Sequence, residues 1–472
     1  MQTLPEFIFR SVKKLYLPLL LMILTALTPL HAEYHDFNAY ENRLEWLASA
    51  YDDILTLESI GTTLGERAIY AAALGTGNSE QKPALAVIAG VEGADVAASE
   101  LALLFIESIA SQYGQTDSIT ALLTAHTIYV LPRVNPDAAE FFFESPAYTR
   151  QYNLRAMDLD KDGKENEDGY NDLNDDGLIT LMRIEDPTGM WVADQEYPQL
   201  MRKADAAAGE NGMYRLYAEG VDDDNDGEFN EDPDGGVKFN QNFTFQYKYF
   251  RHGSGPHQVS EPNTRAVADF LYNHKNIAAI FTFSPNDNLL HPWKAKPGSG
   301  SGNEPVNNVL TEDELYYNRL AENFKNITSL SGSPEPHRGN GSFSEWGYYH
   351  FGRWSVSAPA WWPPSVHSED DTTVTNEQKA GSDLKKYSAE FQQDVQLLEW
   401  LRSTGQDEKI LSWVEVDHPD FPNHTVEVGG FAPYSRMNPP ADSLESLSES
   451  YTPFFFFFAE SLPEIAVDNI QV

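Results

Sequence analysis

The chain has 472 residues, carries 72 acidic against 32 basic side chains for a net charge of −40, and contains no cysteine. Such a charge repels nucleic acid and anionic membrane surfaces, so nucleic acid is excluded as a partner. Disulfides and thiolate metal sites are excluded as well. The length fits one large domain with a small appendage.

The first 32 residues have the layout of a secretory signal peptide. Arg10, Lys13 and Lys14 precede an apolar run at 15–27, and the small residue Ala32 follows. The run is short for a membrane helix of about 20 residues. We therefore expect export, with no stable membrane span after cleavage. A cysteine-free exported chain favours a bacterial periplasmic or extracellular location.

Helical and strand patterns alternate along most of the chain. Amphipathic or helical spacing occurs at 40–50, 96–109, 264–273, 315–327 and 389–402, and continuous apolar runs occur at 84–89, 128–131 and 277–283. Continuous apolar runs of this length are typical of strands covered on both faces. The alternation predicts an α/β fold with a mixed, largely parallel central sheet between helices. Binding sites in such sheets form at the carboxyl ends of the strands.

Two segments depart from this alternation. Residues 157–236 form an insert rich in Gly, Asp and Asn, in which the helix and strand patterns give way. The main domain is expected at 33–404, and a C-terminal extension at 405–472 holds a strand-like tract and a buried helix face at 454–458. The last residues, 465–472, alternate like a strand without a partner, as in a chain that continues into a further domain.

The acidic insert contains three calcium-type loops, in which oxygen-bearing side chains alternate before a glycine. Such spacing suits a hard cation such as Ca²⁺. The glutamate usual at the twelfth position is missing, and Asp168 and Asp232 at the eleventh are its expected substitutes. The expected calcium ligands are Asp158, Asp160, Asp162, Asp168, Asp172, Asn174, Asp176, Asp222, Asp224, Asp226 and Asp232. The alternative is a solvated acidic loop.

Several motif blocks follow one another at characteristic spacing. They are Ala89-Gly90-Val91-Glu92-Gly93-Ala94-Asp95, Asn135-Pro136-Asp137, Asn240-Gln241-Asn242-Phe243, the run 277–293 ending in His291-Pro292-Trp293, and Gly341 to Trp346 followed by Pro359. In order and spacing these blocks resemble those of zinc carboxypeptidases of the carboxypeptidase A type. The resemblance covers residues 40–402 and implies the α/β fold of that family.

The resemblance places Glu92, Asp95 and Phe283 at the three zinc-ligand positions of the family. Two carboxylates favour Ca²⁺ or Mg²⁺ over Zn²⁺, and phenylalanine has no lone pair to donate to a metal. Pro359 stands at the position of the catalytic glutamate, and proline neither accepts nor delivers a proton. We therefore expect neither zinc nor intact catalytic machinery.

The substrate-binding positions implied by the resemblance are also altered. The family clamps a terminal carboxylate with an Asn-Arg pair, for which this chain has Asn240 and Gln241. A neutral amide loses the charge-assisted hydrogen bonds that arginine would make. Arg150 or Arg155 would match the second arginine of the family, and His337 lies nearest its tyrosine.

The sequence thus indicates an exported pseudo-peptidase that binds a peptide, or a peptide-bearing wall component, in an inherited cleft. Two alternatives stay open. One is an active metallocarboxypeptidase that uses Glu92, Asp95 and a repositioned histidine such as His291. The other is a calcium-stabilised structural or surface protein whose cleft holds no ligand.

Overall fold

The computed structural model describes residues 33–158, 161, 163–227, 229–230, 236–296, 306–336, 338–365 and 384–463. Several predictions lie outside the described residues. These are the signal peptide, the final alternating segment, His337, and the calcium ligands Asp160, Asp162 and Asp232.

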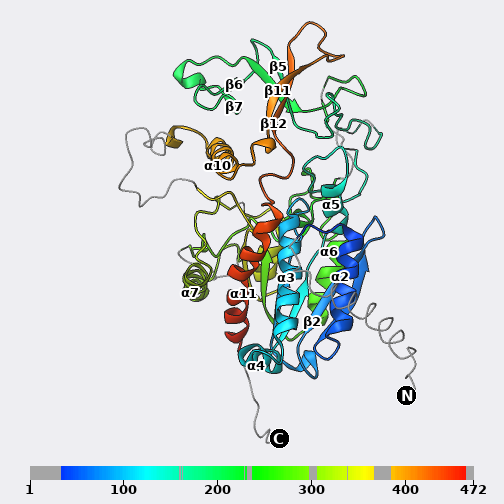
Figure 1. The fold of residues 1–472 in the computed structure, drawn as a ribbon, viewed down its shortest axis with the longest axis vertical. Helices are drawn as coiled ribbons and strands as arrows, with labels where there is room; N and C mark the ends of the chain where they lie inside the picture. Colours follow the sequence, from blue (N-terminus) through cyan, green and yellow to red (C-terminus); the bar gives the residue numbers. More distant parts are fainter. Residues whose placement is uncertain are drawn as a thin grey trace, which may run out of the picture.

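A six-stranded sheet forms the centre of the molecule (Figure 1). Its strands run in the order β1 (Leu55–Thr62), β2 (Ala68–Leu74), β4 (Thr127–Leu131), β3 (Ala84–Ile88), β9 (Ile277–Phe283) and β10 (Trp354–Ala358). The four strands from β4 to β10 are mutually parallel, whereas β1 and β2 pair antiparallel with each other and β2 pairs antiparallel with β4. The expected mixed, largely parallel α/β fold is confirmed.

Helices cover both faces of this sheet, which is why every residue of β3 and β4 is buried. One face packs against α2 (Phe37–Ala50), α3 (Val96–Gln112), α4 (Asp117–Ala125), α7 (Thr311–Thr328) and α11 (Leu444–Glu460). The other packs against α6 (Pro262–Asn273) and α8 (Phe343–Tyr349). The short α5 (Pro136–Glu140) follows β4.

The C-terminal helix α11 is part of the core. Phe454, Phe455 and Phe458 are buried, which confirms the predicted buried face. The Phe455 ring lies 4.7 Å from the ring of Phe281 on β9, and the Phe454 ring lies 4.9 Å from that of Phe324 on α7. The extension therefore returns to the main domain and covers its sheet.

A second six-stranded sheet forms a separate lobe, at the top of Figure 1. Its order is β11 (Ile410–Val416), β12 (Val426–Phe431), β5 (Leu181–Glu185), β8 (Tyr214–Ala218), β6 (Trp191–Ala193) and β7 (Met201–Lys203). The expectation that residues 157–236 lack regular strands is wrong, because four short strands lie in this range. Of the four, β5 pairs antiparallel with the distant β12, and β8, β6 and β7 follow β5 in the sheet. This pairing stabilises segments too short to stand out in the sequence.

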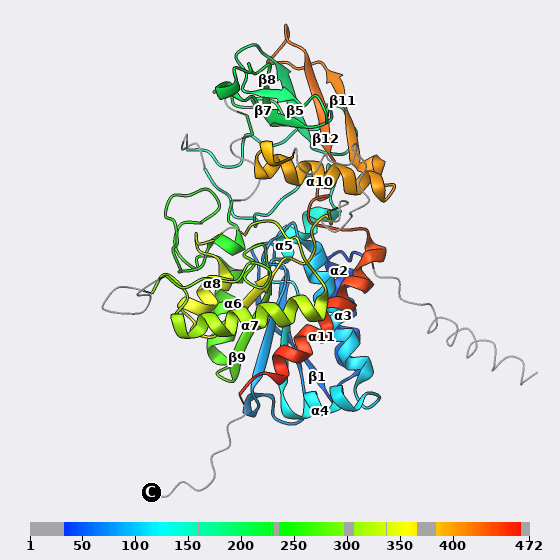
Figure 2. The same ribbon diagram turned by 90° about the vertical axis from the view of Figure 1, so that its left-hand side faces the viewer.

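Helix α10 (Ala389–Ser403) lies between the lobe and the main domain (Figure 2). Phe391, Val395 and Leu398 on α10 pack with Tyr197 and Leu200 of the insert. Toward the other side, the Trp400 ring lies 4.9 Å from that of Trp361, which follows β10. Among the described residues, no helix combines the length and apolar character needed to cross a membrane.

Candidate functional site

The motif blocks converge at the carboxyl ends of β3, β9 and β10, which are neighbours in the sheet. The loop after β3 needs glycine twice. Gly90 has φ of +76°, and a Cβ on Gly93 would lie 2.2 Å from the Cβ of Ala138 in α5. This close approach positions Glu92. The loop ends at Asp95, whose carboxylate accepts a hydrogen bond from Ala98 N at 3.0 Å and caps α3.

Glu92 is held in a buried network of polar side chains. Its exposed fraction is 9%, and its Oε1 accepts a hydrogen bond from the Asn240 amide at 2.6 Å. The same amide donates to Asn286 Oδ1 at 2.6 Å, while Asn240 Oδ1 accepts from Phe343 N at 2.9 Å. Burial raises the pKa of Glu92, although the Asn240 hydrogen bond and the charge of Lys238 oppose this.

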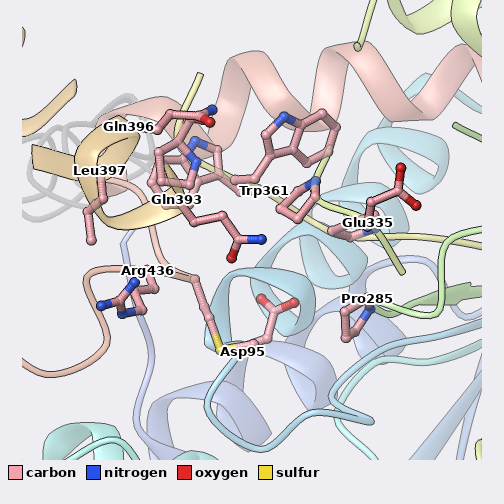
Figure 3. A pocket seen from close by; sticks show the side chains of 13 residues that line it. Asp95, Pro285, Glu335, Trp361, Gln393, Gln396, Leu397 and Arg436 are labelled. Carbon is pink, nitrogen blue, oxygen red and sulfur yellow. The ribbon is translucent and has the colours of Figure 1, made fainter. Parts of the chain in front are cut away.

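Asp95 lines a cavity of about 200 Å³ whose walls include Pro285, Pro359, Trp361 and Gln393. Figure 3 shows its carboxylate directed into this cavity, on the side of the Gln393 amide. Burial raises the pKa of Asp95 to about 7; the hydrogen bond from the helix backbone opposes this, and the charge of Glu92 adds to it. The cavity thus combines proline and tryptophan walls with one acid that titrates near neutral pH.

A second cavity, of about 440 Å³, adjoins the first and shares Pro285 and Met437 with it. Its walls carry Glu92, the amides of Gln151, Asn240, Gln241, Asn286 and Asn340, and the cations Lys238, Arg251 and Arg338. The cleft of this domain therefore has two parts, one largely apolar and one polar and cationic.

Phe283 belongs to the core. Its exposed fraction is 1%, and its ring lies 5.0 Å from that of Phe281 and 5.1 Å from that of Tyr451 on α11. The Tyr451 hydroxyl also donates a hydrogen bond to the carbonyl oxygen of Pro359. The two residues that the resemblance assigns to the third ligand and the general base are therefore both tied to the packing of α11.

These residues do not fit a catalytic zinc ion, which needs three protein ligands and an open position for water. Phe283 offers no donor atom and packs in the core. Over the described part of the chain, a single group of three acidic or histidine side chains converges closely enough to hold a metal, and it excludes Glu92 and Asp95. The proposed loss of zinc thus rests on the chemistry and placement of the residues themselves.

The two candidate substrate arginines make other contacts. Arg150 is 2% exposed, stacks 3.5 Å above the Phe141 ring and donates to Tyr148 Oη at 2.7 Å. Arg155 pairs with Glu261 at 2.8 Å. Both arginines lie outside the walls of the two cavities of the cleft.

The cations on the wall of the second cavity are instead Lys238, Arg251 and Arg338, which the sequence analysis missed. Lys238 had a usable signal, because it stands two residues before Asn240 in a block already recognised. The two arginines lie in loops without a motif, so no local signal pointed to them.

Two other polar side chains near the cleft, His291 and Glu345, contact residues of the surrounding loops. His291 Nε2 lies 3.1 Å from Ser333 Oγ and its Nδ1 3.7 Å from Glu335, and it lines neither cavity. Glu345 accepts hydrogen bonds from Ser342 Oγ and from the backbone N–H of Gly339. It holds the loop before α8.

The calcium-type loops of the lobe share one backbone geometry. The glycine of each loop has a positive φ and donates its N–H to the aspartate five residues earlier: Gly163 to Asp158 at 3.2 Å, Gly177 to Asp172 at 2.7 Å and Gly227 to Asp222 at 3.0 Å. In the second loop, Asp176 N also donates to Asn174 Oδ1 at 3.1 Å. The sequence repeat is therefore a structural repeat.

The third loop brings its carboxylates together. Oxygens of Asp222, Asp224 and Asp226 all lie within 4.8 Å of one another. The pKa of Asp224 is raised, by loss of solvent contact and by the charges of Asp226 and Asp222. Asp168, predicted as a ligand, is 1% exposed and accepts from the backbone N–H groups of Asp223 at 3.1 Å and Asn230 at 2.6 Å. It connects the first loop to the third.

Residues 40–359 match the protein family described as zinc carboxypeptidase. Since the match spans more than half of the chain, the protein belongs to this family. It is 29% identical over 164 residues to carboxypeptidase M of Mus musculus, covering 34% of each chain. It is 29% identical over 121 residues to carboxypeptidase D of Drosophila melanogaster, covering 25% of this chain and 9% of that relative. The matches thus span about a third or less of these curated relatives.

Solved structures give weaker similarities. Thrombin-activatable fibrinolysis inhibitor aligns with a TM-score of 0.45 at 16% identity, over 69% of this chain and 66% of that one. Carboxypeptidase A from Helicoverpa armigera aligns with a TM-score of 0.41 at 14% identity, over 84% of this chain and 81% of that one.

Proposed function

We propose that this chain is an exported, catalytically inactive member of the zinc carboxypeptidase family that binds a peptide, or a peptide-bearing wall component, in its cleft. The observation that carries the proposal is the pair Phe283 and Pro359. The first fills the core against Tyr451, and the second offers only a backbone carbonyl, which is already hydrogen bonded. Neither supplies a metal ligand or a base.

Peptide binding is supported by the polar side chains on the walls of the cleft. A peptide backbone needs hydrogen-bond donors and acceptors, which the amides of Gln151, Gln241 and Asn340 supply. The adjoining cavity, with Trp361 and Trp362 on its walls, suits an apolar side chain. His291 lies outside both cavities, so the alternative of an active enzyme using that histidine gains no support.

A second part of the proposal concerns the lobe, whose three repeated loops we propose to bind calcium. Its support is the shared loop geometry and the convergence of Asp222, Asp224 and Asp226. On this proposal calcium stabilises the lobe and peptide binding belongs to the cleft. A purely structural protein would be stabilised by calcium but would bind no peptide in its cleft.

The decisive experiment measures turnover and binding on the same sample. The purified chain, with and without added zinc, is incubated with a panel of peptides, and release of C-terminal residues is followed by mass spectrometry. The matched control is Glu92→Gln/Asp95→Asn, which removes both carboxylates at the ligand positions. We expect equal background release from both proteins and measurable binding by calorimetry. Chelator-sensitive release that the double variant abolishes would overturn the assignment of inactivity.

A further inference from the structure

Many arginines of this acidic protein are neutralised by a carboxylate. Ion pairs to Asp or Glu are formed by Arg43, Arg67, Arg133, Arg155, Arg183, Arg202, Arg215 and Arg436. In the described part of the chain, Lys238, Arg251 and Arg338 make no such pair, although acidic side chains outnumber basic ones 72 to 32. These three residues are called the cleft cations below.

The cleft cations come from three loops and line a single cavity of about 440 Å³. Lys238 is partly buried, and its ammonium group lies 4.9 Å from the centre of the Tyr152 ring. Arg338 donates one hydrogen bond, from Nη2 to the backbone carbonyl of His291 at 3.0 Å. Burial lowers the pKa of Lys238, and the charge of Arg251 lowers it further against the pull of Glu92. Like charges gathered in this way are stabilised by an anion placed between them.

The rest of the cavity wall offsets these charges only in part. Glu92 is the one acid on this wall, and burial raises its pKa while Asn240 occupies one of its oxygens. Gln241 Oε1 is buried without a hydrogen-bond partner. The wall therefore offers positive charge for acidic groups, together with amides for the backbone that carries them.

We propose that this cavity binds an acidic peptide segment, whose side-chain carboxylates are bound by Lys238, Arg251 and Arg338. The proposal rests on the proposed function, because it specifies which peptides the cleft takes. Three cations on separate loops fit several carboxylates along a segment, and a neutral glutamine occupies the single clamp position expected to hold a terminal carboxylate. Recognition therefore does not require a free C-terminus. Hydrogen bonds between charged partners are about twice as strong as neutral ones.

The test uses fluorescent peptides with an acetylated N-terminus and an amidated C-terminus, binding being measured by anisotropy on the full chain. One peptide carries three consecutive glutamates, and its matched partner carries three glutamines. We expect the glutamate peptide to bind at least about tenfold more tightly, as charge-assisted contacts predict. Its affinity should fall in about 0.5 M salt, because exposed charges are screened.

The variant Arg251→Gln/Arg338→Gln removes two exposed cations of the cavity, and Arg319→Gln on the exposed face of α7 is the matched control. We expect the first to weaken binding of the glutamate peptide about tenfold or more and the second to leave it unchanged. Thermal melting of each variant verifies the fold, and Lys238→Met gives a third measurement at the same cavity.

Each of the following results would overturn a specific part of the proposal. Equal binding of the glutamate and glutamine peptides, or an unchanged double variant, overturns the acidic preference and leaves peptide binding intact. The same two peptides with a free C-terminus are measured alongside, and binding only of these versions does the same. Binding of inorganic phosphate without binding of the glutamate peptide identifies a phosphate site and overturns the inference. Absence of binding for every peptide overturns both this inference and the proposed function.

Discussion

The two groups of carboxylates in this protein lie in opposite environments. Glu92 and Asp95 are buried in the main domain, and burial is the largest cause of their raised pKa values. Asp222, Asp224 and Asp226 lie in a loop of the lobe, partly or fully exposed, with their oxygens within 4.8 Å of one another. In the first group, burial favours the protonated form, and each carboxylate accepts a hydrogen bond. The second is suited to relieve its charge by binding a cation.

The two acidic residues that the resemblance assigns to metal-ligand positions therefore differ from the lobe carboxylates in what they contact. Asp95 caps a helix and Glu92 is held by Asn240, while the third position is an aromatic ring in the core. The lobe has no inherited metal motif of the family, yet it presents three converging carboxylates. The two groups of carboxylates differ in whether their oxygens converge on one point and in whether solvent reaches them.

The largest expected effect concerns the third ligand position. Phe283→Ala should destabilise the protein by about 3–5 kcal/mol, because it opens a cavity between β9 and α11. Phe250→Ala is the matched control, since that ring is 99% exposed, and it should change stability very little. Urea unfolding of both variants measures the difference. A small effect of Phe283→Ala would mean that this ring faces the cleft. The contrast between a site buried in the core and an exposed loop in the lobe would then be wrong.

Calcium should act on the lobe with the next largest effect. Saturation at a hundredfold excess over Kd adds about 2.7 kcal/mol to the stability of the folded state. Melting curves in millimolar calcium and in chelator should therefore differ, and Asp222→Asn/Asp226→Asn should reduce the difference. Asp442→Asn, at an exposed position elsewhere, should leave it intact. Superimposed curves for the unmodified chain would contradict calcium binding.

The smallest expected effect is a pH dependence in the main domain. The folded pKa of Asp95 is about 7, above its ordinary value of 3.8. Between these values the unfolded chain loses this proton while the folded chain keeps it. Stability from this group is therefore full below pH 4, falls as pH rises, and levels off above pH 7.

Asp95→Asn removes this titration and keeps a side chain that can cap α3. The variant should be more stable than the parent at pH 8 by on the order of 2 kcal/mol, since one pKa unit corresponds to about 1.4 kcal/mol and local relaxation relieves part of the cost. The difference should vanish near pH 4. Denaturant unfolding across this range measures it, and a constant difference between the two proteins would show that Asp95 is not the titrating group.

The sequence by itself determined the family and the character of the main sheet. Continuous apolar runs at 84–89 and 277–283 identified strands buried on both faces, because local hydrophobicity reports local burial. The ordered blocks assigned Glu92, Asp95, Phe283 and Pro359 to the family positions by resemblance, and this assignment stays a prediction. The chemistry of each side chain follows from its identity alone. The repeat of Asp and Gly in the insert reappears in the structure as three glycines with positive φ, and calcium binding by these loops stays a prediction.

Only the tertiary structure joined the insert to the C-terminal extension. Leu181 pairs with Gly429 across the lobe sheet, and no local periodicity in either segment encodes a partner more than 200 residues away. The same holds for the cleft cations, since Lys238, Arg251 and Arg338 come from loops whose sequences carry no common pattern. Local propensity reflects interactions over a few residues, whereas a charged cavity or a sheet between distant segments exists only after the chain has brought them together.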